Sequence, residues 1–396
     1  MRLSCPAKIN LHLRVGRRRA DGFHPLLTWM TTVGLFDTLT VETLPQPAGG
    51  DGSLARPDAR QDVQPPPGRE RAGAERILLL SSDLPGLPQD ESNLVVRAAQ
   101  AFAAAIAGSG AGDVNKGTAV GTSQGDKRAD AKSGSVSYQH PATEAVPTSV
   151  GVGEGVGDAP GTAKGRPTRG SGEAARVVPV IAGLKKTIPL GAGLGGGSSD
   201  AARTLMGLNR FWQANWPVER LSPIAEKLGS DVPFFLHGPS SICTGRGEVV
   251  RPVSRPTAAR WAVLVLPEIH MPTAAVYRRF DELGLGFDDE MGREPDWKQW
   301  ADLSAKELLV RLVNDLERPA FEIRPDLGTL RADIELLLER PVRMSGSGSS
   351  LFTLFDAERE ATLAAADISA RFTSRALTVD VAPDAPDDLN TAITPA

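Results

Sequence analysis

Residues 189–203, PLGAGLGGGSSDAAR, place a dense run of glycines, two serines and an aspartate directly before an alanine-rich stretch. Glycines leave main-chain NH groups uncovered, and the first amides of a helix carry about half a positive charge. A helix that begins here would form an anion cradle, for which phosphate is the usual guest. Ser198, Ser199 and Asp200 are candidate caps of that helix. A flexible turn with a cap is the simpler alternative, although a turn alone poorly explains so many glycines.

The common phosphate-binding motifs do not fit this segment. The P-loop pattern needs a lysine after its last glycine, and here Gly197 is followed by Ser198. A G-x-G-x-x-G match at residues 191–196 is preceded by Pro189 rather than directly by a strand, and it lacks the later acidic residue of dinucleotide folds. The H-R-D and D-F-G motifs of protein kinases are absent from the sequence.

Three polar residues elsewhere in the chain have ordinary structural explanations. Asp231 follows the helix stop Gly229, where an isolated aspartate usually forms an Asx turn. Lys8 and Asn10 alternate with apolar residues, so they lie on the same face of a predicted strand. A lysine on an open sheet face is usually solvated. Taken alone, these residues leave both a structural and a chemical role open.

The hydrophobic pattern predicts strands and helices that are interspersed without strict alternation. The strand at 7–15 has apolar residues on one face only, so we expect it to be half-buried. Further strands are predicted at 38–44, 75–81, 176–183, 232–236 and 261–267, with a strand pair at 343–355. Helices are predicted at 92–107, with Ser92 as the N-cap, and at 198–214 and 219–229. This mixture favours an α+β fold over a doubly wound parallel sheet.

Two segments differ in composition from the rest of the chain. Residues 45–74 are rich in Pro, Gly and Arg, and residues 107–175 contain mainly small residues. Neither segment can bury enough apolar surface to offset the entropy of ordering, so both are predicted to be disordered insertions. Residues 382–396 also have the composition of a loose tail. The remaining chain is long enough for two medium-sized domains.

The bulk properties exclude several classes of protein. A net charge of −4 and a pI near 5.9 argue against binding to nucleic acids or to membrane surfaces. No apolar run approaches the ~20 residues of a membrane span, and the amino terminus lacks a signal-peptide core. Two cysteines, Cys5 and Cys243, form no disulfide framework and no metal cluster, which favours a reducing cytoplasm.

Several motifs resemble those of a known family, the GHMP small-molecule kinases, which include galactokinase, homoserine kinase and mevalonate kinase. The similar segments are PLGAGLGGGSSDAA, PAKINLHLRVGRRRADGFHPL and GSDVPFFLHG, with ESNLVVRAA, MPTAAVY, VNDLE and RMSGSGSSLF following the same order. They are most similar to one branch, whose members phosphorylate the 2-hydroxyl of a cytidine diphosphate-linked methylerythritol in the non-mevalonate route to isoprenoid precursors. The resemblance covers nearly everything except the two insertions and the tail.

The resemblance implies a two-domain α+β fold. Residues 1–259 would form an ATP-binding domain resembling ribosomal protein S5 domain 2, and residues 260–384 a ferredoxin-like domain. Residues 385–396 would be a flexible tail, and the active site would lie in the cleft between the domains.

The resemblance also implies roles for particular residues. Asp231 would accept the proton of the substrate hydroxyl, and Lys8 would orient that carboxylate and offset developing charge. ATP would be bound by Pro189, Leu190, Gly191, Ala192, Gly193, Leu194, Gly195, Gly196, Gly197, Ser198, Ser199 and Asn93. For Asn93, a helix-capping role explains the residue equally well. The substrate would be bound by Asn10, Phe23, His24, Thr273 and Tyr277, with aromatic rings stacked on the pyrimidine and His24 bonded to its polar edge.

ATP would arrive with Mg²⁺ as a co-substrate, and no tightly bound cofactor is expected. The protein ligands of the metal stay unknown, with Ser199 and Asp200 as candidates. Relatives can carry Asn in place of Asp200, whose extra charge beside a triphosphate would need a cation or solvent to offset it. Residues 345–350, SGSGSS, are either a hairpin loop or, by resemblance, a second glycine loop near the phosphates. His12, His237 and Cys243 are interpreted as structural.

Three other functions stay open on the sequence alone. The chain could be another GHMP kinase with a different small alcohol or acid substrate, or a nucleotide-binding regulator without activity. A dinucleotide-dependent dehydrogenase is a more distant alternative. In each case the expected partner is a small molecule rather than a nucleic acid or a membrane, and the oligomeric state is undetermined.

Overall fold

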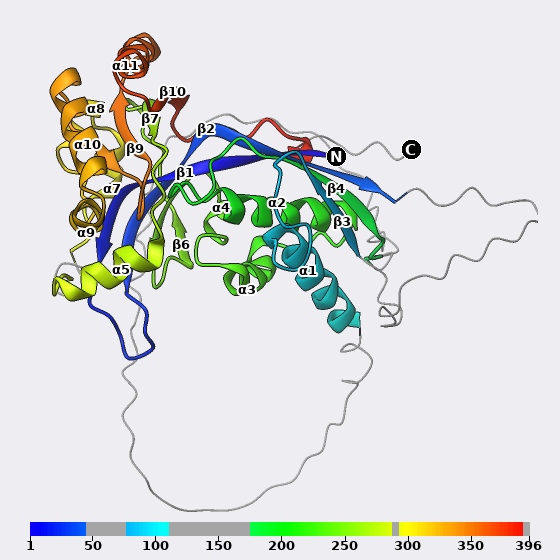
Figure 1. Ribbon diagram of the computed structural model, residues 1–396. Coiled ribbons are helices and arrows are strands. Elements are labelled where there is room, and N and C mark those ends of the chain that lie inside the picture. Colours follow the sequence, from blue (N-terminus) through cyan, green and yellow to red (C-terminus); the bar gives the residue numbers. More distant parts are fainter. Residues whose placement is uncertain (45–76, 111–174, 287–292, 391–396) are drawn as a thin grey trace, which may run out of the picture. The chain divides into compact units, whose positions relative to one another are not determined.

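The computed structural model describes residues 1–44, 77–110, 175–286 and 293–390, which Figure 1 shows in colour. These residues belong to one compact unit. The predicted insertion at 45–74 lies outside the described residues, as does all of the second insertion between 111 and 174. Helix α1, Leu94–Gly110, extends into the first residues predicted to be disordered. No helix in the described ranges combines the length and apolar character needed to cross a membrane.

The first sheet contains six strands and is built around one long strand, β2, Leu26–Thr43. Strand β1, Arg2–Val15, pairs antiparallel with β2 along one edge. The other edge of β2 pairs with β4, Val180–Lys185, and with β5, Ser240–Thr244. The sheet is completed by β3, Leu78–Ser82, parallel to β4, and by β6, Val249–Pro252, antiparallel to β5.

Four helices of the first sheet's half gather on one side of it (Figure 1). They are α1, α2 (Gly196–Phe211), α3 (Val218–Leu228) and α4 (Phe234–His237). Phe102 of α1 stacks on Trp212 at the end of α2, with ring centroids 5.7 Å apart. Both side chains are buried in a core shared with β1 and β4, which fixes α2 against the sheet.

The second sheet contains four antiparallel strands in the order β10-β7-β9-β8. They are β7 (Trp261–Leu266), β8 (Arg343–Met344), β9 (Leu351–Phe355) and β10 (Arg375–Asp380). The helices of this half are α5 (Thr273–Glu282), α7 (Trp297–Ala301), α8 (Ala305–Leu309), α9 (Glu317–Ile323), α10 (Pro325–Leu338) and α11 (Glu358–Arg371). The architecture is α+β, as the sequence predicts.

Backbone contacts join the first sheet to two segments of the second half, the chain before α9 and the chain after β10. Leu13 of β1 forms a bridge with Asn314, and Val33 of β2 forms one with Val381. The Ala382 amide donates to the Thr32 carbonyl at 2.8 Å. The first sheet ends before the predicted boundary at residue 260 and the second begins after it. The boundary itself, and the assignment of 1–259 and 260–384 as separate domains, stay predictions.

Three predicted elements need correction. Strand β1 is buried on both faces rather than one, because the polar face that carries Lys8 is covered by the glycine segment. Residues 234–237 are helical although a strand is predicted at 232–236, since a short buried apolar run fits either element. Helix α1 is capped by Asn93, whose Oδ1 accepts from the Val95 amide, whereas Ser92 bonds to Asp90.

The chain after β10 is also more ordered than its composition indicates. The Ser4 hydroxyl donates to the Pro386 carbonyl at 2.8 Å, and the Arg2 amide donates to Asp388 at 2.7 Å. Arg203 of α2 pairs with Asp387 at 3.2 Å, and a short 3-10 helix spans Asp388–Asn390. These residues therefore pack against β1 and α2. Residues 391–396 lie outside the described ranges.

Candidate active site

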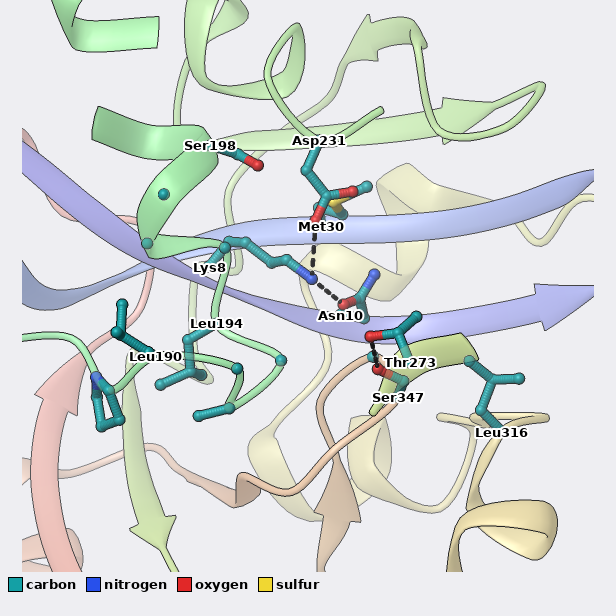
Figure 2. A pocket seen from close by; sticks show the side chains of 18 of the residues that line it. Lys8, Asn10, Met30, Leu190, Leu194, Ser198, Asp231, Thr273, Leu316 and Ser347 are labelled. Carbon is teal, nitrogen blue, oxygen red and sulfur yellow. Dashed lines mark hydrogen bonds and ion pairs between the residues drawn. The ribbon is translucent and has the colours of Figure 1, made fainter. Parts of the chain in front are cut away.

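The glycine segment forms one wall of a cavity of about 340 Å³ whose other walls come from β1, α5 and the loop at 345–350 (Figure 2). The lining residues include every sequence-predicted member of the segment from Pro189 to Ser198. Lys8, Asn10, Asp231, Thr273 and Tyr277 line the same cavity. Residues far apart in the chain are therefore brought to one place, as the resemblance predicts.

The glycines of this segment are required by backbone conformation and by space. Gly191, Gly193 and Gly195 have positive φ values of 67°, 77° and 67°. A Cβ on Gly193 would lie 2.4 Å from the Ser345 carbonyl oxygen, which is too close for any side chain. The chain thus passes directly over the loop at 345–350, and only glycine allows that approach.

Helix α2 begins earlier than its candidate caps imply. Its first residue is Gly196, and Gly195 occupies the N-cap position in the left-handed conformation without a side-chain cap. Ser198, Ser199 and Asp200 are therefore inside the helix rather than capping it. The first amides of a helix lack intrahelical partners, so those of residues 196–198 are available to an anion in the cavity.

Lys8 and Asp231 form an ion pair on the wall of this cavity. The Lys8 Nζ lies 3.4 Å from Asp231 Oδ2 and donates to Asn10 Oδ1 at 2.6 Å (Figure 2). The Lys8 side chain is 6% exposed, whereas that of Asp231 is 33% exposed. The Asn10 amide nitrogen in turn donates to the Thr28 hydroxyl at 2.9 Å, which fixes its oxygen toward Lys8. A buried ammonium therefore supports a carboxylate that a ligand can still reach.

The loop at 345–350 is both a hairpin connection and a neighbour of the glycine segment. It joins β8 to β9, the Ser345 hydroxyl donates to the Gly193 carbonyl at 3.1 Å, and the Ser350 amide donates to the Ala192 carbonyl at 3.2 Å. Asn314 supports it from below by donating to the Met344 and Gly346 carbonyls, each at 2.8 Å. Sequence reasoning assigned no role of its own to Asn314, although the VNDLE motif that contains it was a signal.

A second cavity of about 660 Å³ contains the predicted aromatic pocket and shares Asp231, Thr273 and Tyr277 with the first. The rings of His24 and Tyr277 lie 5.1 Å apart at 36°. Phe23 is 49% exposed, and the Arg246 guanidinium lies 4.9 Å from the centre of its ring. A flat ligand in this pocket would thus lie beside aromatic faces and within reach of Asp231.

Two polar groups of this pocket are more constrained than the sequence indicates. The His24 Nδ1 faces the Gly16 carbonyl at 3.0 Å, and its Nε2 faces Asp281 Oδ1 at 3.3 Å. Both ring nitrogens are engaged, so the predicted bond from His24 to the edge of a base would require one of these contacts to break. Burial and the Asp231 charge raise the pKa of the Tyr277 hydroxyl, which keeps it protonated at neutral pH.

Three sequence-predicted residues, Asn93, Ser199 and Asp200, line neither cavity. Both ends of the Asn93 side chain bind the main chain, since its Nδ2 also donates to the Pro88 carbonyl at 2.7 Å. Ser199 and Asp200 are buried residues of α2 that do not line the cavity. Asp200 pairs with Lys186 at 2.7 Å, so the cation that offsets its charge belongs to the protein. Nothing in the sequence pattern identifies Lys186 as that partner.

Comparison with known proteins agrees with this geometry. Residues 169–239 match the family described as GHMP kinases N terminal domain. A solved mevalonate kinase structure, 8% identical, aligns over 97% of this chain and 100% of its own with a TM-score of 0.55. The fold is the GHMP kinase fold, with the mixed helix and strand content that the resemblance implies.

Within this class, the chain is similar to 4-diphosphocytidyl-2-C-methyl-D-erythritol kinases. It is 36% identical over 194 residues to the one from Burkholderia cenocepacia (strain HI2424), covering 47% of this chain and 61% of that relative. It is 35% identical over 200 residues to the one from Burkholderia mallei (strain SAVP1), covering 48% of this chain and 63% of that relative. The crystal structure of a 4-(cytidine 5'-diphospho)-2C-methyl-D-erythritol kinase, 26% identical, aligns over 97% of this chain and 100% of its own with a TM-score of 0.58. The chain thus spans less than two thirds of the curated relatives it matches.

Proposed function

We propose that this chain phosphorylates the 2-hydroxyl of 4-diphosphocytidyl-2-C-methyl-D-erythritol with ATP, giving the 2-phosphate and ADP. The observation that carries the proposal is the position of the Lys8–Asp231 pair opposite the uncapped amides of the glycine segment in one cavity. The similarity to enzymes of that name supports the choice of substrate. The reaction would belong to the methylerythritol phosphate route to isoprenoid precursors.

The glycine segment would hold the triphosphate. Residues 189–198 would surround it, with the amides of residues 196–198 and the positive end of α2 facing its charge. The loop at 345–350 would cover the opposite side of the triphosphate. Phosphoryl transfer depends mainly on positioning and on charge stabilisation, which fixed main-chain donors supply.

Asp231 would act as the base. As the substrate oxygen bonds to the γ-phosphorus, the bond from that phosphorus to the β,γ-bridging oxygen breaks and ADP leaves. The hydroxyl proton passes to Asp231, and Lys8 keeps the carboxylate oriented and offsets negative charge near the attacking oxygen. An aspartate is a weak base, which suffices when proton transfer is late in a loose transition state.

Magnesium would enter with the nucleotide rather than occupy a site of its own. No group of three or more His, Cys, Asp or Glu side chains in the described ranges could hold a metal ion. Ser199 and Asp200 do not fit as ligands because they are buried away from the cavity. Mg²⁺ keeps several waters when it binds a nucleotide, and through the phosphate oxygens it would neutralise phosphate charge.

The cytidine end of the substrate would occupy the aromatic pocket. Phe23 and Tyr277 would provide the stacking surfaces, and Thr273 and Asn10 would contact the substrate nearer to Asp231.

We also propose that the reaction takes place in the cytoplasm, because Cys5 and Cys243 are free thiols, which is usual in a reducing compartment.

One coupled assay tests this proposal. Purified protein with MgATP should release ADP when the cytidylated tetritol is supplied, and should ignore the same tetritol phosphate without its cytidine. Phosphorylation of a different small alcohol or acid instead would identify another kinase of this fold. Nucleotide binding without ADP release for any polyol would identify a regulator, and either result would contradict the proposal.

A further inference from the structure

A buried cluster of one lysine and two aspartates lies beneath the glycine segment, outside the cavity. Lys186 donates both to Asp37 and, at 2.7 Å, to Asp200. The side chains of Lys186, Asp37 and Asp200 are 3%, 0% and 4% exposed. We call these three residues the anchor cluster.

The anchor cluster binds both ends of the glycine segment to one strand. Asp37 lies on β2, Lys186 directly follows β4 at the entry to the segment, and Asp200 lies in α2 at its exit. Asp37 Oδ1 also accepts from the Thr187 and Ile188 amides, at 2.5 and 2.9 Å. The entry is therefore held by three hydrogen bonds to Asp37 and the exit by one to Lys186.

The cluster also lies directly against the first residue of α2. A Cβ on Gly196 would be 3.3 Å from Lys186 Nζ and 3.0 Å from Ile188 Cγ2. Gly196 is thus packed on the lysine, and its amide is one of those that face the cavity. A shift of the lysine by a fraction of an ångström would be transmitted to that amide.

The charges of the cluster are nearly balanced. Burial raises the pKa of Asp200 to about 7, although the positive charge of Lys186 acts to lower it. Two carboxylates share one ammonium, so a proton on Asp200 leaves the cluster neutral. Either way, the Asp200 charge is shielded from the cavity by a partner inside the protein.

We propose that Lys186 is a positioning residue for the triphosphate, because it ties the exit of the glycine segment to its entry and so holds the uncapped amides of α2 in place. Lys186 touches no nucleotide in this arrangement and acts through the backbone of residues 187–196. The inference rests on the proposed role of this segment in binding ATP. It does not depend on which alcohol is phosphorylated.

The test compares two replacements of one residue. Asp200→Asn keeps an oxygen that accepts from Lys186, whereas Asp200→Leu removes the hydrogen bond between Lys186 and α2. Both variants leave the Lys186–Asp37 pair with no net charge, so we expect both to fold. Binding of a non-hydrolysable ATP analogue, adenylyl imidodiphosphate with Mg²⁺, is measured by calorimetry without any acceptor. We expect Asp200→Leu to weaken binding about tenfold, equivalent to about 1.4 kcal/mol, and Asp200→Asn to bind like the parent.

Two further variants complete the design. Lys186→Met should weaken binding of the analogue at least as much as Asp200→Leu, while Lys185→Met, at the exposed neighbouring position, should not. In a steady-state assay in which the ATP concentration is varied, Asp200→Leu should raise KM for ATP and leave kcat and the acceptor KM close to the parent. A merely structural role would lower the melting temperature without this selective effect.

The result that overturns the proposal is a folded Asp200→Leu protein with parental affinity for the analogue, and equal losses in the Asn and Leu variants would overturn it as well. If the parent binds the analogue but phosphorylates no cytidylated tetritol, the proposed function fails and the comparison of affinities still decides this inference.

Discussion

The Lys8 ammonium lies 3.4 Å from the Asp231 carboxylate, although one residue comes from the first strand and the other from the turn between α3 and α4. The pair combines a buried cation with a half-buried anion at the junction of the two cavities. Because Asn10 also accepts from Lys8, the ammonium is held between two oxygens and directs the carboxylate to the opening.

This arrangement predicts that Lys8 and Asp231 act as a unit. Asp231→Asn should lower kcat by ~10²- to 10⁴-fold, the usual contribution of a positioned base, while the nucleotide still binds. Lys8→Met should cost a similar factor, and the double variant should be little worse than either single one. Steady-state kinetics and calorimetry of nucleotide binding measure both quantities.

The control for that cycle is Asp367→Asn on the exposed face of α11, which should leave kcat unchanged. Turnover at the parental rate in Asp231→Asn would remove Asp231 from its role. Strictly multiplicative losses in the double variant would show that the two side chains act separately.

A second prediction concerns the close approach of the two loops. Gly193→Ala should lower the free energy of unfolding by about 1–3 kcal/mol, because the new methyl group meets the Ser345 carbonyl and φ is positive. It should also weaken nucleotide binding by moving the segment. Urea denaturation and calorimetry provide the readouts.

Gly108→Ala is the matched control, since this glycine lies in α1 and a Cβ added to it would meet no atom within 4 Å. It should be neutral or stabilise the protein by up to about 1 kcal/mol through helix propensity. If Gly193→Ala had the same effect as Gly108→Ala, the close contact between the two loops would not matter for stability or for nucleotide binding.

A third prediction separates the two cavities. Tyr277→Ala should raise KM for the cytidylated substrate about 10- to 100-fold, since stacking of a base on an aromatic ring is worth ~1–3 kcal/mol. The KM for ATP should stay near the parental value. Tyr277→Phe keeps the ring and should show a much smaller effect. An equal rise in both KM values would place Tyr277 outside a dedicated base pocket.

A fourth prediction concerns acid stability. Burial lowers the pKa of His12 to about 4 from its ordinary value of 6.5, and the charges of Arg14 and Arg343 act in the same direction. Between about pH 4 and 6.5, His12 is therefore protonated in the unfolded chain but neutral in the folded protein. The stability contributed by neutral His12 is complete above about pH 6.5 and is lost as the pH falls toward 4, by at most about 1.4 kcal/mol per pH unit.

His12→Asn keeps an acceptor for the Val313 amide, which His12 Nδ1 now binds at 3.3 Å, without the titrating group. The difference in unfolding free energy between parent and variant should shrink on acidification across this range. Asp200 acts in the opposite sense, but it is common to both proteins and cancels. A difference that is independent of pH would contradict the assignment.

The sequence predicted the elements whose apolar pattern is long and the sites whose motifs are local. The strands at 261–267 and 343–355 and the helix stop at Gly229 are confirmed. The glycine segment lines a cavity, whereas anion binding by it stays a prediction. The proximity of Lys8 and Asp231 followed from the family resemblance, because no local pattern places these two residues together.

What the sequence could not provide depends on partners remote in the chain. The polar face of β1 alternates like a solvated face, yet it is buried because other segments cover it. Asp200 has the pattern of a cap or metal ligand, but Lys186 and Asp37 bind it in the interior. The engagement of both His24 nitrogens likewise depends on Asp281, from a helix far along the chain.

Strand β1 has one further consequence for how this protein can vary. Its pairing with β2 is interrupted at two positions, between Pro6 and Ala7 and between Asn10 and His12, and Lys8 lies between them. A single-residue insertion or deletion in this stretch would exchange the two faces of the strand, and a deletion before Lys8 would bring Ile9 to the place of the ammonium. The length of this strand is therefore fixed as well as its residues, and any circular permutation of this protein should keep residues 2–15 uncut.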